Sequence, residues 1–354
     1  MMDNLETKPV TLRQVAERAG VSASTASLVL NAKGEFPQIT RERVLDAASS
    51  LGYTPRGVRA KVDVTRTLRF IRISKHGETV NRDHNHFISD YIDGMSQEAT
   101  RRDYVLEVVT HDSADLSGVL AASDSRNLDG AIVLGTELSE QDVQMLAGCG
   151  ARIVFIDTYY PRLNANFVDM DNDQTVFAIA CHMRDAGFRR VGFVGSTADV
   201  ANFRLREDAF LKACKSIGIE VLKMDRIRVA ATRDGAFEQA KHYLKIHNDI
   251  AEAYFCVNDI VAFGMMRALQ ESGYAIPVDV SIFGFDNLPM SSLLSPSLST
   301  VDVPKQQIGA TAVRLIDDLI GAGASQPSIK VLVSGRLILR KSTRKSSEAK
   351  LTHL

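Results

Sequence analysis

The sequence predicts an α/β protein with a three-helix unit at its N-terminus and a larger core of two doubly wound parallel-sheet subdomains. Three observations lead to this fold class. The chain has 354 residues, which is more than one hydrophobic core usually holds. Two short, capped helices separated by a glycine are predicted near the N-terminus. From Leu68 onward, β-rich runs alternate with amphipathic helical stretches, and this alternation occurs twice.

The stretch "TLRQVAERAGVSASTASLVL" predicts two helices. Thr11 and Gln14 have the spacing of a capping box, so the first helix begins directly after Thr11. Gly20 ends it, because glycine adopts a positive φ without steric cost. Ser22 is a good N-cap for a second helix over Ala23 to about Leu30. Together they predict a helix-turn-helix, whose second helix enters the major groove of DNA.

Hydroxyl groups crowd the start of the second predicted helix. They belong to Ser22, Ser24, Thr25 and Ser27. Small hydroxyl side chains bond phosphates or base edges without holding a helix away from DNA, and a helix N-terminus favours a phosphate. We include Thr11 among the candidate DNA contacts. The alternative is an ordinary helical hairpin with no DNA role.

A third helix is expected over 40–51, with Thr40 as its cap and Gly52 as its stop. Residues 1–66 hold ten Lys or Arg against seven Asp or Glu, while the remainder has a net charge of −4. The basic surplus therefore lies on the small N-terminal unit, as expected for a DNA-binding head. Residues 56–67 form a basic linker in which Arg59 would lie near DNA.

The predicted core strands are short and apolar. Helices are expected between them, over 88–101, 176–186, 205–217 and 261–272, and a break falls at about 158–172. In such folds the ligand binds in the crevice at the carboxyl ends of the strands. The strand sequences are "LRFIRI", "YVLEVVT", "GAIVLG", "RIVFID", "RVGFVG", "AYFCV" and "VSIFGF".

The sequence contains no recognised catalytic motif. The sequence contains no GxGxxG, GxxxxGK[ST], GxSxG or HExxH pattern, and its four cysteines are too far apart for a metal or redox pair. His84 and His86 could bind a metal, but histidines in such a sequence more often belong to a polar loop. We expect no enzyme activity, cofactor or metal. With neither a signal peptide nor an apolar run of membrane length, we expect a cytoplasmic protein.

The segments "TLRQVAERAGVSASTASLVLN" and "TRERVLDAASSLGYTP" resemble the headpiece of the lactose-repressor (LacI/GalR) family of bacterial transcription regulators. In that family Ala23, Ser24 and Leu28 would occupy the base-reading positions. Leu28 stands where arginine is frequent, so the family's guanine readout is not expected there, and an apolar contact with a thymine methyl is one replacement. Asn31 and Thr25 match backbone-contact positions. Val62 matches the family's minor-groove wedge, with a plain linker as the alternative.

The core motifs "LDGAIVLG", "FVDMDND", "FRLREDAF", "YFCVNDIVAFG" and "VSIFGFDN" also follow the family's order, and the family is similar to periplasmic sugar-binding proteins. The resemblance implies effector contacts at Asp157, Asn202, Arg206, Asn258 and Asp286. Paired carboxylates, amides and a guanidinium suit vicinal hydroxyls. The loop before Phe87 is longer than in the family and should overhang the cleft. His84, Asn85, His86 and Phe87 would then reach the effector, with Phe87 stacking on a sugar face.

These features predict a repressor that binds a palindromic operator in double-stranded DNA as a homodimer, controlled by a small carbohydrate. The expected parts are a headpiece (1–55), a hinge (56–67), an effector-binding and dimerisation domain (68–345) and a polar tail (346–354). The two subdomains are expected at about 68–160 with 300–326 and at about 161–299 with 327–345. A purine, nucleoside or phosphorylated-sugar effector remains an alternative, as does a sugar-binding or sugar-processing protein with an added helical head.

Overall fold

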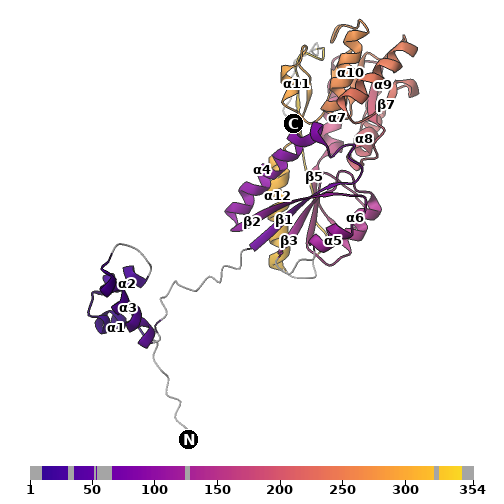
Figure 1. Cartoon of the computed structure of the whole chain (residues 1–354). Helices are drawn as coiled ribbons and strands as arrows, with labels where there is room; N and C mark the ends of the chain where they lie inside the picture. The colour runs from indigo at the N-terminus through magenta and orange to yellow at the C-terminus, as the bar shows by residue number, and fades with distance from the viewer. Residues whose placement is uncertain are drawn as a thin grey trace. The chain divides into compact units, whose positions relative to one another are not determined.

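The computed structural model describes residues 10–30, 36–51, 53, 66–123, 128–322 and 327–344. The chain divides into two compact units, 1–65 and 66–354, which are described separately (Figure 1). Asn31, Arg59 and Val62, most of the expected hinge and the expected tail lie outside the described residues.

The N-terminal unit contains three helices, α1 (Leu12–Ala19), α2 (Ala23–Leu30) and α3 (Gln38–Leu51). The Thr11 main-chain N–H donates to Gln14 Oε1 (2.7 Å), and the Gln14 N–H donates to the Thr11 hydroxyl (3.4 Å), which confirms the capping box. Gly20 has φ 66° and ends α1. Eight apolar side chains form the buried core of the unit: Val15, Ala16, Ala19, Ala26, Val29, Val44, Ala47 and Ala48.

The third helix begins earlier than predicted. It starts at Gln38, so Thr40 lies inside the helix and is not its cap. The carbonyl of Pro37 accepts from the main-chain N–H groups of Thr40 (2.9 Å) and Arg41 (3.1 Å). Helical hydrogen bonding therefore begins at the Pro37 carbonyl, ahead of Thr40.

The first sheet of the larger unit has six parallel strands in the order β11-β5-β4-β3-β1-β2. Alternate residues of β1 enter two separate apolar layers, one with α4 and α12 and the other with α5 and α6 (Figure 1). The strands are β1 (Arg66–Ser74), β2 (Tyr104–Asp112), β3 (Gly130–Leu134), β4 (Ile153–Ile156), β5 (Asn166–Met170) and β11 (Lys330–Val333); the helices are α4 (Asn85–Arg101), α5 (Ser117–Ser123), α6 (Glu140–Ala147) and α12 (Lys305–Ala322).

The second sheet has four parallel strands in the order β7-β6-β8-β9, and β10 pairs with β12 in a separate antiparallel ribbon. The strands are β6 (Val191–Ser196), β7 (Arg226–Val229), β8 (Ala253–Cys256), β9 (Ser281–Phe283), β10 (Thr300–Asp302) and β12 (Arg336–Ile338). The helices in this part are α7 (Asn172–Asp185), α8 (Ala201–Ile217), α9 (Arg233–Ile246), α10 (Asp259–Glu271) and α11 (Met290–Leu293), with short 3-10 turns η1 (Arg82–His84) before α4 and η2 (Lys223–Asp225) before β7.

The expected subdomain boundaries differ from the sheets in two places. Residues 166–170 and 330–333 were assigned to the second subdomain, but β5 and β11 are strands of the first sheet. β5 pairs with β4 through Val154 and Asn166, and β11 pairs with β5 through Lys330 and Phe167. Sheet membership depends on these partners, which are remote in the chain, and the local pattern of a short apolar run does not contain that information.

Helix α4 is held in place by close contact with α12. A Cβ added at Gly94 of α4 would lie 1.9 Å from the carbonyl oxygen of Gln306 on α12. The first turns of α4 carry Phe87, Ile88 and Tyr91, all buried. No helix among the described residues is long and apolar enough to cross a bilayer.

Candidate functional site

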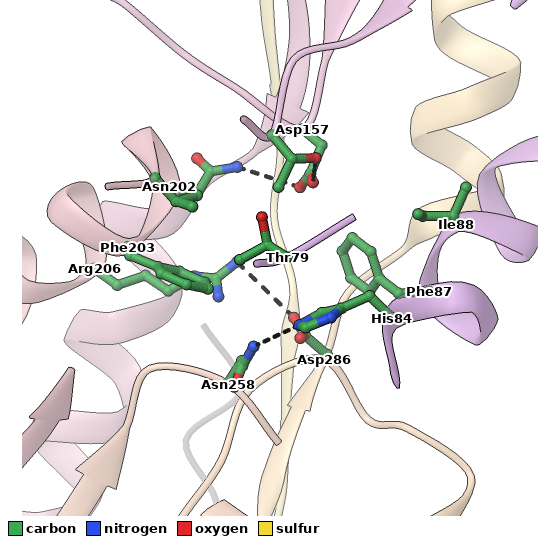
Figure 2. Close-up of a pocket in the computed structure, with 12 residues that line it drawn as sticks. Thr79, His84, Phe87, Ile88, Asp157, Asn202, Phe203, Arg206, Asn258 and Asp286 are labelled. Atoms are coloured by element: carbon green, nitrogen blue, oxygen red, sulfur yellow. Dashed lines mark hydrogen bonds and ion pairs between the residues drawn. The ribbon is translucent and has the colours of Figure 1, made fainter. Parts of the chain in front are cut away.

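A pocket lies between the two sheets. Side chains of both halves line it (Figure 2), and all six predicted effector residues are among them. The segments 79–88, 136 and 157 supply Thr79, His84, Phe87, Ile88, Thr136 and Asp157; the segments 200–206, 258 and 286 supply Val200, Asn202, Phe203, Arg206, Asn258 and Asp286.

The carboxyl ends of the parallel strands supply much of the polar lining. Thr136 follows β3, Asp157 follows β4, Asn258 follows β8 and Asp286 follows β9. This is the edge at which open α/β sheets bind ligands. Two of these residues have left-handed backbones, Asp157 with φ 55° and Asp286 with φ 114°. Such conformations are costly for residues other than glycine and often mark binding sites.

Asn202 and Arg206 lie one turn apart on α8 and therefore share a face. The Arg206 guanidinium is 2% exposed and is held rigidly. Its Nε donates to Asn172 Oδ1 (3.0 Å), and its Nη1 donates to the Val257 carbonyl (2.8 Å). The guanidinium also lies 3.9 Å from the centre of the Phe285 ring. The protein thus fixes this cation before any ligand arrives.

Asp157 accepts three hydrogen bonds. They come from the hydroxyl of Thr136 (2.5 Å), the hydroxyl of Tyr91 (3.3 Å) and the side-chain amide of Asn202 (3.4 Å). Burial raises the pKa of Asp157, and these donors and Arg206 partly offset that rise. Asn202 also donates to Asp169 Oδ1 (3.3 Å), so one amide links two buried carboxyl groups.

Asp286 is the pocket residue whose hydrogen bonding is least satisfied. Its Oδ1 is buried and has no hydrogen-bond partner, and the nearest cationic atom is Arg206 Nη2 at 3.9 Å. Lys305 Nζ donates to the main-chain carbonyl of Asp286 (2.8 Å) and not to its carboxyl group. Burial raises the pKa of Asp286 to about 8. An unpaired buried acceptor favours a ligand that brings a hydrogen-bond donor.

His84 joins the two halves across the pocket (Figure 2). Burial lowers the pKa of His84 to about 4, so its ring is neutral near pH 7. Its Nε2 accepts from the side-chain amide of Asn258 (3.4 Å), and its Nδ1 lies 3.2 Å from Asn81 Oδ1. Asn258 Oδ1 accepts from the Val261 N–H (2.9 Å) and caps α10. The neutral tautomer with hydrogen on Nδ1 satisfies both contacts of the ring.

The long loop before α4 meets the pocket only in part. His84 and Phe87 line it, but Asn85 and His86 do not. Asn85 Oδ1 accepts from Arg72 Nη2 (3.1 Å), and His86 lines a different cavity with Asp83. Asn85, His86 and Phe87 begin α4, where successive side chains point about 100° apart, and this separates neighbours in the sequence. Within the described ranges, no group of three His, Cys, Asp or Glu side chains is placed to hold a metal ion.

Sequence reasoning missed several lining residues. Phe203 comes from α8 in one half, opposite Phe87 of α4 in the other (Figure 2). Its place inside "NFRLR", between Asn202 and Arg206, was an available signal. Thr79 and Thr136 had no comparable signal, because only the fold brings these separate loops together. Ile88 and Val200 complete the apolar part of the wall.

The N-terminal unit presents the predicted DNA-contact face to solvent. Thr11, Ser22, Ala23, Ser24 and Leu28 are exposed, and the Leu28 side chain is 43% exposed. Thr25 and Ser27 are partly buried. The Ser22 hydroxyl accepts from the Thr25 N–H (3.0 Å), so Ser22 is the N-cap of α2 as predicted.

Two family models match the chain. Residues 11–56 match the bacterial regulatory proteins of the lacI family, and residues 180–343 match a periplasmic binding protein-like domain. Fold and pocket therefore define a helix-turn-helix head joined to a ligand-binding core of the periplasmic-binding type. The head is thus similar to that of the lacI family of bacterial regulatory proteins, and the core is similar to periplasmic binding proteins.

Curated relatives and solved structures span most of the chain. The HTH-type transcriptional repressor PurR of Haemophilus influenzae is 26% identical over 344 residues, covering 94% of this chain and 98% of the relative. The lac repressor dimer bound to operator and the anti-inducer ONPF has a TM-score of 0.71 at 23% identity, covering 95% and 99%. A complex of the regulator CelR with cellobiose has a TM-score of 0.68 at 22% identity, covering 94% and 99%. At these identities the two structures support the fold alone.

Proposed function

We propose that this chain is a transcriptional repressor that binds an operator as a homodimer and responds to a small effector in the pocket between its two sheets. The observation that carries the proposal is the pairing of an exposed helix-turn-helix face with a polar pocket built from both halves of the core. The curated relatives named PurR are transcriptional repressors, which agrees with this role. A DNA-binding regulator acts where the chromosome is, so we assign it to the cytoplasm.

A neutral carbohydrate suits the hydrogen-bonding groups of the pocket. Asp286 Oδ1 has no partner, and with a pKa of about 8 the carboxyl is protonated near pH 7, so it can both donate and accept, as hydroxyl groups do. The Arg206 guanidinium already donates to Asn172 and Val257, which leaves it fewer N–H groups for the oxygens of a phosphorylated sugar. The curated relatives named PurR are transcriptional repressors, so we propose a regulator without enzyme activity.

A purine is the second candidate, and one observation favours it. Phe87 and Phe203 face the pocket from opposite halves, where a flat ring could lie between them (Figure 2). N–H groups of a purine would also suit Asp286. Several curated relatives are repressors named PurR, which supports keeping this candidate beside the carbohydrate.

The control mechanism follows from the position of the pocket. A ligand that contacts both halves stabilises one relative arrangement of them, and only a difference in affinity between two arrangements shifts their populations. The resulting coupling to DNA binding is typically about 1–3 kcal/mol, or about 5- to 150-fold in affinity. Induction and co-repression use the same parts, so the sign of the response is decided by experiment.

Fluorescence anisotropy with DNA from upstream of the gene tests the proposal. The complex is titrated with glucose, galactose, ribose, cellobiose, hypoxanthine, guanine and glucose 6-phosphate. We expect specific DNA binding and at least one uncharged compound that changes the affinity about tenfold or more. Response to glucose 6-phosphate alone would contradict the effector class. If the wild-type chain does not bind this DNA specifically, the proposed role as a transcriptional regulator is contradicted.

Variants assign the response to the pocket. Arg206→Ala should abolish the effector response and keep operator affinity, and Arg206→Lys shows whether the charge suffices without the guanidinium geometry. Arg204→Ala is the matched control, because Arg204 lies on the same helix with its side chain 45% exposed. Equal loss of effector response and DNA binding in Arg206→Lys, with Arg204→Ala unaffected, would contradict the assignment.

A further inference from the structure

The loop after β1 is folded around one carboxylate, that of Glu137. Glu137 is 4% exposed and lies in the turn between β3 and α6. Its two oxygens accept from five main-chain N–H groups of the loop at 2.7–3.0 Å, and also from the Thr79 hydroxyl (3.0 Å). The five donors are the N–H groups of Lys75, His76, Gly77, Thr79 and Val80.

Negative charge is essential to this arrangement. Burial opposes ionisation of Glu137, but the main-chain donors outweigh it and lower its pKa to about 2. The side chain is therefore a carboxylate at any physiological pH, and both oxygens act only as acceptors. A glutamine in its place would turn an NH₂ group toward N–H donors. It would lose the hydrogen bonds that one of the two carboxylate oxygens accepts from the loop.

The loop held by Glu137 reaches the pocket through two residues. Thr79 bonds Glu137 directly and lines the pocket. Asn81 donates to the carbonyls of Gly77 (3.2 Å) and Glu78 (2.8 Å) and contacts the ring of His84. His84 in turn contacts Asn258 in the other half. An unbroken series of hydrogen bonds thus runs from Glu137 to the far side of the pocket.

We propose that Glu137 is a positioning residue for effector recognition: it holds loop 75–81 so that Thr79 and His84 form one wall of the pocket and His84 links the two halves through Asn258. This inference rests on the proposed function of the pocket. Glu137 itself does not line the pocket, so its effect on the effector passes through the loop.

The ring of His84 reports the position of the loop without any ligand. In the folded core, burial is the largest influence on its pKa and lowers it, while the charges of Asp83 and Glu137 raise it. Glu137→Gln removes one of these raising charges. If the loop stayed in place, the pKa of His84 would fall further. If the loop is released, the ring becomes hydrated and its pKa rises toward the ordinary 6.5.

The test is an NMR titration of the full chain with labelled histidine, in which His84→Ala identifies the His84 signal. We expect Glu137→Gln to raise the pKa of His84 by at least one unit and to speed hydrogen exchange at amides 75–80. Glu140→Gln, in the exposed first turn of α6, is the matched control and should change neither. A pKa of His84 that stays or falls in Glu137→Gln would overturn the proposal.

A second arm measures recognition, with cellobiose and hypoxanthine as probes on the operator complex. Glu137→Gln and His84→Ala should each weaken the response about tenfold, and the double variant should be no weaker than Glu137→Gln, because both act through one wall. If the losses of effector response in the two single variants add up in the double variant, Glu137 and His84 do not act through the same pocket wall. If neither probe acts on the wild type, the proposed effectors are wrong, and the titration of His84 still decides the role of Glu137.

Discussion

Asp286→Asn should stabilise the core while abolishing its response to effector. The Asp286 carboxyl is buried with an unpartnered Oδ1, and its pKa in the folded core is about 8 against an ordinary 3.8. Between these values the folded core keeps a proton that the unfolded chain releases. Wild-type stability therefore falls as the pH rises from about 4 to about 8, by up to about 1.4 kcal/mol per pH unit from this group.

Asparagine does not ionise, so the difference in free energy of unfolding between Asp286→Asn and the wild type must grow with pH. Integration gives about 2–3 kcal/mol more advantage for the variant at pH 7 than at pH 5. At pH 7 the buried acid lowers the free energy of unfolding by about 4 kcal/mol in total. The asparagine variant removes this cost, but its unsatisfied amide lowers the free energy of unfolding by about 1–3 kcal/mol. A net gain of about 1–3 kcal/mol at pH 7 follows.

Urea unfolding at pH 5, 6 and 7, followed by circular dichroism, measures this difference. Asp318→Asn is the matched control, because Asp318 is exposed on α12. Its curve should keep the pH dependence of the wild type. Parallel pH curves for the wild type and Asp286→Asn would refute the reasoning, since they would mean that Asp286 is as easily ionised in the folded core as in the unfolded chain.

Three further predictions concern packing, capping and DNA binding. Gly94→Ala should cost about 1–3 kcal/mol or more of core stability in urea unfolding, because the new Cβ would meet the Gln306 carbonyl; Gly321→Ala, with open space around it, is the control. Thr11→Ala should cost the head about 1 kcal/mol, seen as faster hydrogen exchange at the first amides of α1, and unchanged exchange would contradict the capping box. Operator affinity should fall about tenfold or more between 50 and 200 mM salt in anisotropy titrations, and a flat response would argue against phosphate contacts by the head.

Local features of the sequence determined the head. A capping box, a turn glycine and a serine N-cap each act within a few residues, so the beginnings of α1 and α2 and the end of α1 could be predicted. The predicted beginning of α3 was wrong, because Thr40 is not the cap and the helix begins two residues earlier, at Gln38.

The pocket was predictable in part for a similar reason. The family resemblance implied Asp157, Asn202, Arg206, Asn258 and Asp286. Three of them, Asp157, Asn258 and Asp286, follow apolar strands, and parallel strands bring their carboxyl ends to one edge. That the six predicted residues bind an effector remains a proposal, whereas their convergence on one pocket is a property of the structure.

Tertiary structure alone decided the features that depend on distant partners. Sheet membership of β5 and β11 follows from strand pairing across the chain, and a short apolar run does not specify its partner. Glu137 is one acidic residue among many in the sequence, and only folding brings it beneath a loop more than 55 residues away. Sequence patterns encode interactions between neighbours, while burial, charge and pairing between remote segments exist only once the chain has folded.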